Sequence, residues 1–295
     1  MERQILTGKS EMLEQCGRIF IAIAMVGFGI QHWLLNGIVG GLELVPEGLP
    51  GHTIWADLTG AILIAAGVSL AINKGARLSS MVLANLFFLA ELVRRMPSIA
   101  AIVQDLAERT VVFETLALGS GCLIVASILP AGERDSARWK KASQTAGKVG
   151  RILFAISMAV FGWTHLLIPQ FIATLIPAWM PWHLFLAYFT AFGFIAVGIG
   201  FAANRAVRPA AGLLGLMFLL WVITLHGPRV AMALSNRFEW NSAFVALAMS
   251  GVAFVMAGVR DPVQAAAPRL VIRSEPAPDR RAALRAHSPS GSARA

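Results

Sequence analysis

Eight long apolar runs constrain the fold of this chain more than any other feature. Each holds about 20 mostly apolar residues, the length that a helix needs to cross roughly 30 Å of hydrocarbon. The runs are at residues 17–36, 53–72, 77–96, 110–130, 150–168, 183–203, 208–226 and 241–259. Charged residues make up 14% of the chain, against about a quarter in a soluble domain. The short alternating segments of a membrane barrel are absent. The sequence therefore predicts an all-α, polytopic integral membrane protein with eight transmembrane helices.

The two halves of the chain resemble each other. Residues 17–34 and 150–167 share ten identities in eighteen positions, and residues 46–97 and 177–228 share fifteen in fifty-two. This similarity predicts a tandem duplication of a four-helix unit. Because each unit has an even number of spans, the two repeats should be parallel. The expected parts are an N-terminal cytoplasmic segment, a first repeat, a basic cytoplasmic linker, a second repeat and a disordered basic cytoplasmic tail: 1–16, 17–130, 131–149, 150–259 and 260–295.

Lysine and arginine in the connections predict the orientation. Residues 37–52 and 168–182 contain neither, whereas the linker and the tail are rich in both. The positive-inside rule therefore places both termini in the cytoplasm. The basic tail and linker, which supply much of the net charge of +9, fit anionic lipid, and no nucleic-acid recognition motif accompanies them. No cleavage site follows the first run, so we expect a retained helix.

Ionisable and polar side chains gather at one predicted depth, near the periplasmic mouth of each repeat. The predicted pocket residues are His32, Asp57, Glu91, Arg94, Arg95 and Glu114 in the first repeat, and His165, Tyr188, His226 and Arg229 in the second. Burying such groups in a membrane costs on the order of 2.5–3.5 kcal/mol each, so they should pair or line a wet cavity. Glu91 and Arg95 are four residues apart and should pair on one helical face, with His32 or Glu114 joining across helices.

Simpler interpretations of the same residues remain open. The histidines fit hydrogen-bonded packing residues, the outer arginines fit snorkelling side chains, and the tryptophans fit an aromatic belt. A single haem between His165 and His226 is a further alternative. The pairs Gly67/Ala71 and Gly198/Ala202 are typical of close helix packing. Cys16 and Cys122 form no metal-binding pattern, and we predict no metal site. No catalytic motif is visible, so an enzymatic activity stays undecided.

The segments "GRILFAISMAVFGWTHLL", "LIPAWMPWHLF" and "LLWVITLHGPRV" resemble the DoxX-like family of small bacterial four-helix membrane proteins. The resemblance covers residues 150–259 clearly and 17–130 more weakly, so the chain would be a doubled member. It implies a bacterial inner membrane and a quinone connection, because some relatives are membrane subunits of quinone-linked redox systems. In the first half, the stretch "LHGPR" reads "RRMPS", so the roles of His226 and Arg229 are not simply duplicated.

These observations favour a quinone-interacting or accessory subunit of a membrane redox system, with a redox partner protein. Its outer pocket would receive a quinone headgroup or a small periplasmic solute, with histidine donating a hydrogen bond or a proton to a quinone carbonyl. One alternative is a small-solute transporter or permease, although the polar residues cluster at one face and no broken helix is evident. The other alternative is a non-catalytic membrane scaffold that holds a partner protein.

Overall fold

A computed structural model describes residues 2–37, 39, 41–42, 44–46, 48–95, 105–129 and 136–259. The Arg95 side chain and the predicted tail 260–295 lie outside this part. The first half contains α1 Glu2–Leu34, α2 His52–Ile72, α3 Ala76–Arg95 and α5 Leu106–Ile128. The second half contains α6 Ala137–Leu167, α7 Pro169–Leu175, α8 His183–Ala202, α9 Val207–Trp221, the π-helix η1 Val222–His226, α10 Gly227–Met232 and α11 Arg237–Ala257.

Eight of the described helical segments are long and apolar enough to cross a membrane. The all-α membrane class is therefore confirmed. Two helices begin well before the apolar runs that predicted them, because hydropathy marks where lipid contact ends and not where the helix ends. Thus α6 starts at Ala137, inside the predicted linker, where the Ser136 side chain accepts a hydrogen bond from the Trp139 backbone N–H at 3.2 Å. The seventh run was predicted to end at residue 226, yet the helical path continues through η1 and α10 to Met232.

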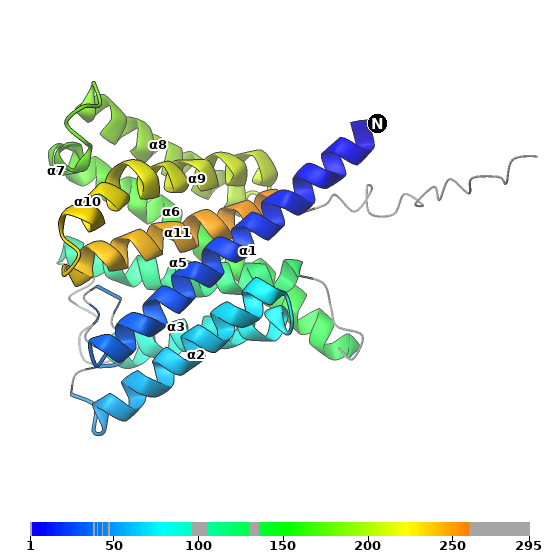
Figure 1. The fold of residues 1–295 in the computed structure, drawn as a ribbon. Helices are drawn as coiled ribbons and strands as arrows, with labels where there is room; N and C mark the ends of the chain where they lie inside the picture. The colour runs from blue at the N-terminus through cyan, green and yellow to red at the C-terminus, as the bar shows by residue number, and fades with distance from the viewer. Residues whose placement is uncertain are drawn as a thin grey trace, which may run out of the picture. The chain divides into compact units, whose positions relative to one another are not determined.

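The helices pack on their chain neighbours and also across the two halves. In the first half α1 packs on α2 and α3 on α5, and in the second α6 packs on α8 and α9 on α11. In addition, α1 packs along α11, as Figure 1 shows for the dark blue and orange ribbons, and α6 packs along α5. The first long helix of each half is therefore held by the last helix of the other half. Corresponding helices pack together in the two halves, as a duplication requires. The duplication itself stays a prediction.

Glycines make the closest of these helix contacts. A Cβ added to Gly251 on α11 would lie 2.6 Å from the carbonyl oxygen of Gly17 on α1. On the α1–α2 and α6–α8 contacts, a Cβ on Gly67 or Gly198 would lie 2.9 or 2.8 Å from a carbonyl oxygen of the neighbouring helix. Such close backbone approach is the usual basis of helix association in membranes.

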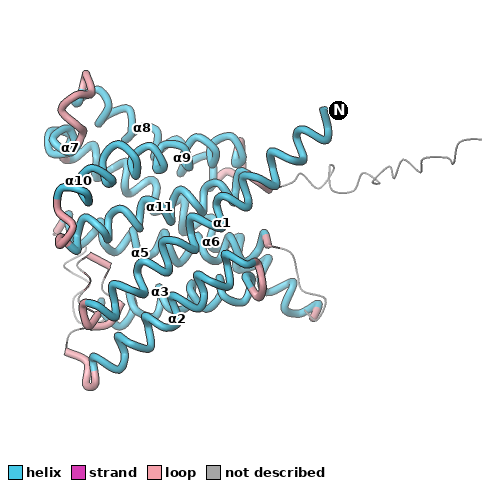
Figure 2. The backbone as a smooth tube through the Cα atoms, viewed as in Figure 1, coloured by secondary structure: helices cyan, strands magenta, loops and turns pink. Residues whose placement is uncertain are grey.

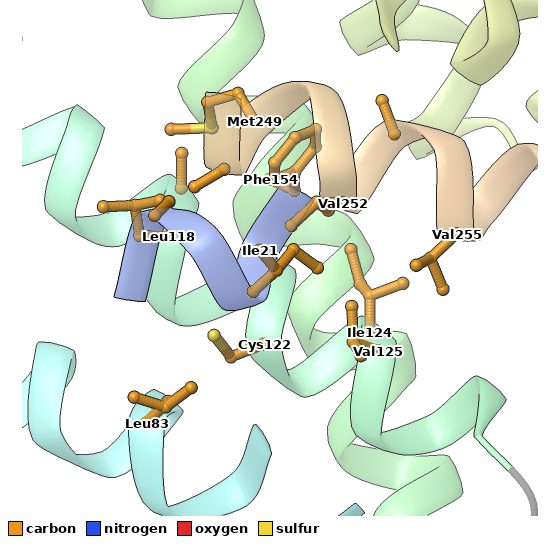
Figure 3. Close-up of a cluster of buried hydrophobic side chains, with 14 of the residues drawn as sticks. Ile21, Leu83, Leu118, Cys122, Ile124, Val125, Phe154, Met249, Val252 and Val255 are labelled. Carbon is orange, nitrogen blue, oxygen red and sulfur yellow. The ribbon is translucent and has the colours of Figure 1, made fainter. Parts of the chain in front are cut away.

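The core lies where the two halves meet. Figure 3 shows side chains from α1, α3, α5, α6 and α11 at this place, among them Ile21, Leu83, Leu118, Phe154 and Met249. Figures 1 and 2 show that α7, α10 and the loop before α2 lie at one end of the helices, opposite the N-terminus. We call this end the α7 end.

Candidate functional site

His32 lies in the last turn of α1, near the α7 end, and is completely buried. Its Nδ1 is 2.8 Å from the carbonyl oxygen of Phe28. Because a carbonyl only accepts, Nδ1 carries the proton, and the Nε2 of a neutral ring is an acceptor. This Nε2 is buried, and no hydrogen-bond partner for it is found in the described part of the chain. His52, at the start of α2, is close enough to interact electrostatically with His32.

The described part of the connection between α1 and α2 is largely buried. Its apolar side chains are buried, namely Val39, Leu42, Leu44 and Val45. A Cβ on Gly41 would lie 2.8 Å from the Asn241 Nδ2 on α11, and a Cβ on Gly37 would lie 3.1 Å from the His52 Cε1 on α2. The described part of this connection therefore packs between α1, α2 and α11 and closes the first half at the α7 end.

The other predicted residues of the first half are only partly brought together. Glu91 is buried, and its Oε2 is 4.0 Å from the Nε of Arg94, three residues later. The predicted pair of Glu91 with Arg95 lies outside the described side chains. Glu114 is half-buried on α5, and the described residues offer it no hydrogen bond or ion pair. Asp57 is exposed on α2, where its backbone carbonyl accepts a hydrogen bond from the Trp33 Nε1 at 3.0 Å, so its carboxylate does not face a shared interior pocket.

His165 on α6 repeats the arrangement of His32 in a more open setting. Its Nδ1 is 2.8 Å from the carbonyl oxygen of Phe161, so its Nε2 is also an acceptor in the neutral ring. Unlike His32, it is only half-buried. Its ring is nearly parallel to that of Trp221, with 6.4 Å between centroids and 11° between planes, and it meets the Phe194 ring edge-on at 5.4 Å. Phe218 completes this aromatic wall, 5.6 Å from Trp221.

The π-helical turn η1 separates Trp221 from His226. Here the backbone N–H of Gly227 bonds to the carbonyl of Val222, five residues earlier. Pro228 explains this turn, because proline has no N–H to donate and its ring crowds the carbonyl of Thr224, four residues earlier. In an α-helix, a residue five positions on lies about 140° around the axis. In a π-helical turn, whose hydrogen bonds join residues five apart, the fifth residue lies closer to the side of the helix on which the first residue lies. His226 therefore lies nearer to the side of Trp221 than it would in an α-helix.

His226 and Arg229 are neighbours at this point, close enough to interact electrostatically. His226 is half-buried, and its Nδ1 has no hydrogen-bond partner within the described residues. Arg229 donates a hydrogen bond from Nη2 to the carbonyl oxygen of Leu175 at 3.3 Å and so ties α10 to the end of α7. Tyr188, by contrast, is exposed on α8.

Sequence reasoning missed the aromatic wall and the π-turn. Trp221 was interpreted only as one of many interfacial tryptophans, and Phe194 carried no signal among so many apolar residues. Pro228 was the available signal for the π-turn, because it lies within a stretch that remains helical. Among the described residues, no three His, Cys, Asp or Glu side chains are grouped so that they could hold a metal ion.

Part of the chain is similar to a known protein family. Residues 14–94 match the DoxX family model, whereas no curated protein and no solved structure matches the chain. The match runs from α1 to the end of α3, and so falls in the half where the sequence resemblance was expected to be weaker. Residues 14–94 of this helical membrane protein are therefore similar to the DoxX family.

Proposed function

We propose that this protein is an accessory subunit of a bacterial inner-membrane redox system, and that its second half binds the headgroup of a quinol. In this proposal both termini are cytoplasmic and the α7 end faces the periplasm. The observation that carries the proposal is the half-buried His165, stacked on Trp221 with its Nδ1 held by the carbonyl of Phe161.

The residues present fit a hydroxylated aromatic ring better than an oxidised quinone. The neutral His165 presents Nε2 as an acceptor, which can receive a hydrogen bond from a quinol hydroxyl but offers nothing to a quinone carbonyl. This reverses the donor role expected for histidine from the sequence. The partly exposed Trp221 supplies an apolar surface for the ring, with the buried Phe194 and Phe218 packed behind it, and His226 and Arg229 supply polar groups at the same end.

The test is a titration of the full-length protein in lipid nanodiscs with a short-chain quinol and with its oxidised form. Since a neutral hydrogen bond contributes about 0.5–1.5 kcal/mol, the quinol should bind about threefold to tenfold more tightly. His165→Phe should remove this difference. Trp163→Phe, on the exposed face of the same helix, is the matched control and should keep it. Absence of binding, or equal affinity for both forms in the unmodified protein, would reject the quinol site.

A transporter is the second candidate, and η1 is the observation that favours it. Departures from regular α-helix within a span recur at transport and functional sites. If the transporter proposal holds, proteoliposomes should accumulate a small solute and lose this uptake in Pro228→Ala, because the alanine N–H lets the helix close with normal α-helical bonds. If the protein is a scaffold, even the unmodified protein should not bind quinol. Variants at His165 and His226 should then alter how much of a partner protein is recovered with the chain.

A further inference from the structure

We propose that each half binds an anionic phospholipid at the end opposite α7, with an acyl chain between its first two long helices and the phosphate beside a basic turn. In the first half, an open groove of about 280 Å³ separates α1 from α2. Its lining is entirely apolar and is formed by Ile19, Ala22, Ile23, Val26, Gly67, Val68 and Ala71. Gly67 lines this groove and has no side chain to fill it, and the same glycine lets α1 approach α2 closely.

A buried guanidinium lies at one end of this groove. Arg18 directly precedes the lining residue Ile19, and its Nη1 donates to the carbonyl oxygen of Leu70 at 2.9 Å, next to the lining residue Ala71. Only 8% of Arg18 is exposed, yet its Nε has no hydrogen-bond partner in the described residues. A buried charged donor without a partner is costly, so an acceptor is expected to approach it.

Lys74 adds a second, exposed cation on the same side. It follows the cap residue Asn73 of α2, and its carbonyl accepts a hydrogen bond from the Ser69 hydroxyl at 2.6 Å. The exposed ammonium lies within a few residues of Leu70, where Arg18 is bound. An apolar groove that ends at two cations matches a ligand with an apolar tail and a phosphate. An anionic phospholipid has both, and the net charge of +9 agrees with such a partner.

The second half repeats the main parts of this arrangement. Arg151 donates from Nη1 to the Asn204 side chain after α8, and its Nε likewise has no partner in the described chain. Arg205 is exposed at the position that corresponds to Lys74. Gly198 approaches the carbonyl of Ala155 as Gly67 approaches that of Ala22. Since the two halves share these features, we expect two lipids for each chain. Binding requires a movement of Arg18, because its Nε is buried as it stands.

Native mass spectrometry of the full chain in detergent, with equal concentrations of phosphatidylglycerol or phosphatidylethanolamine, tests the proposal. The unmodified protein should retain up to two phosphatidylglycerol molecules, at least threefold more than phosphatidylethanolamine. Lys74→Gln should remove one of them, and Lys74→Gln with Arg205→Gln should remove the preference. Equal retention of the two lipids by the unmodified protein, or an unchanged preference in the double variant, would overturn the proposal.

A second variant tests the groove without changing charge. Ile23→Trp, at a half-exposed lining position, should fill the groove and lower retention of phosphatidylglycerol at least twofold. Val82→Trp, on the exposed face of α3 outside the groove, is the matched control and should leave retention unchanged. Equal retention by both variants would show that no acyl chain occupies this groove. Arg18→Gln also removes the bond to Leu70 and so affects folding as well as charge, which is why Lys74 is the primary position.

Discussion

The two histidines that occupy matching positions in the halves have the same local geometry and different surroundings. Both hold Nδ1 2.8 Å from the carbonyl four residues earlier. His32 is fully buried, whereas His165 is half-buried against Trp221. A residue kept in place by its own helix can therefore serve packing in one half and remain accessible in the other.

The connections after these helices explain the difference. In the first half, Val39, Leu42, Leu44 and Val45 are buried in the bundle. In the second half, the corresponding region forms the short helix α7, and its Phe171 and the following Trp179 are exposed. The wall of the second half also has Trp221 where the first has Ala90, and Phe194 where the first has Leu63. The first half is closed and aliphatic at this point, and the second half is open and aromatic.

Thiol labelling should show the largest effect of this difference. In a Cys16→Ser background, which removes the exposed native thiol, His165→Cys should react with a small maleimide about 100-fold faster than His32→Cys. The buried position reacts only through local opening, and an opening free energy of about 3 kcal/mol gives that ratio. The remaining native thiol, Cys122, is buried and serves as the unreactive reference. Equal rates at positions 32 and 165 would mean that the first half is not closed.

Alanine substitution should separate the halves by stability. His32→Ala should lower the free energy of unfolding by about 2–4 kcal/mol, because it empties a fully buried site. His165→Ala should cost about 1 kcal/mol or less, since the side chain is half-exposed. Unfolding of both variants in mixed micelles by denaturing detergent measures the two values. Similar losses for the two variants would contradict the assignment of a packing role to His32 and a binding role to His165.

The eight spans and the helical class follow from the sequence because hydrocarbon imposes both helix length and apolar composition. The pairing of α1 with α11 does not follow from the sequence. A repeated sequence pattern indicates which helix surfaces fit together, but it does not indicate whether the partner helix comes from the same half or from the other half. Glu91 is predicted to pair with Arg95, whose side chain lies outside the described residues, and the structure shows its Oε2 4.0 Å from the Nε of Arg94. Both spacings put the two residues on one helical face, so the sequence alone favours neither arginine.

The position of the candidate site can be predicted from the sequence more readily than its composition. The expected depths of His165, His226 and Arg229 come from counting residues along regular helices. The side of the helix on which His226 lies depends on η1 and cannot be read from a 3.6-residue period. Asp57 and Tyr188 lie near the starts of α2 and α8, and their side chains are exposed, because the position along a helix does not determine which face of the helix a residue occupies.

Pro228→Ala should make the seventh span more like the regular α3 and so weaken the contrast between the halves. The alanine supplies the missing N–H and removes the proline ring, which lets the turn close with α-helical bonds and places His226 about 140° around the axis from Trp221. Quinol affinity should fall about tenfold, which corresponds to about 1.4 kcal/mol. Pro181→Ala, in the exposed loop before α8, is the control and should change affinity less than twofold. An unchanged affinity in Pro228→Ala would remove η1 and His226 from the binding site.

The smallest effects should come from the predicted pocket residues whose side chains face outward. Asp57→Asn and Tyr188→Phe, at matching positions of α2 and α8, should each change the free energy of unfolding by about 0.5 kcal/mol or less, because exposed side chains contribute little. Neither should alter the preference for quinol over quinone. The same detergent unfolding and nanodisc titrations measure both quantities. A large loss of binding in Tyr188→Phe would extend the site from the wall at Trp221 across the outer face of α8, and a large loss of stability in Asp57→Asn would show that its carboxylate is used despite its exposure.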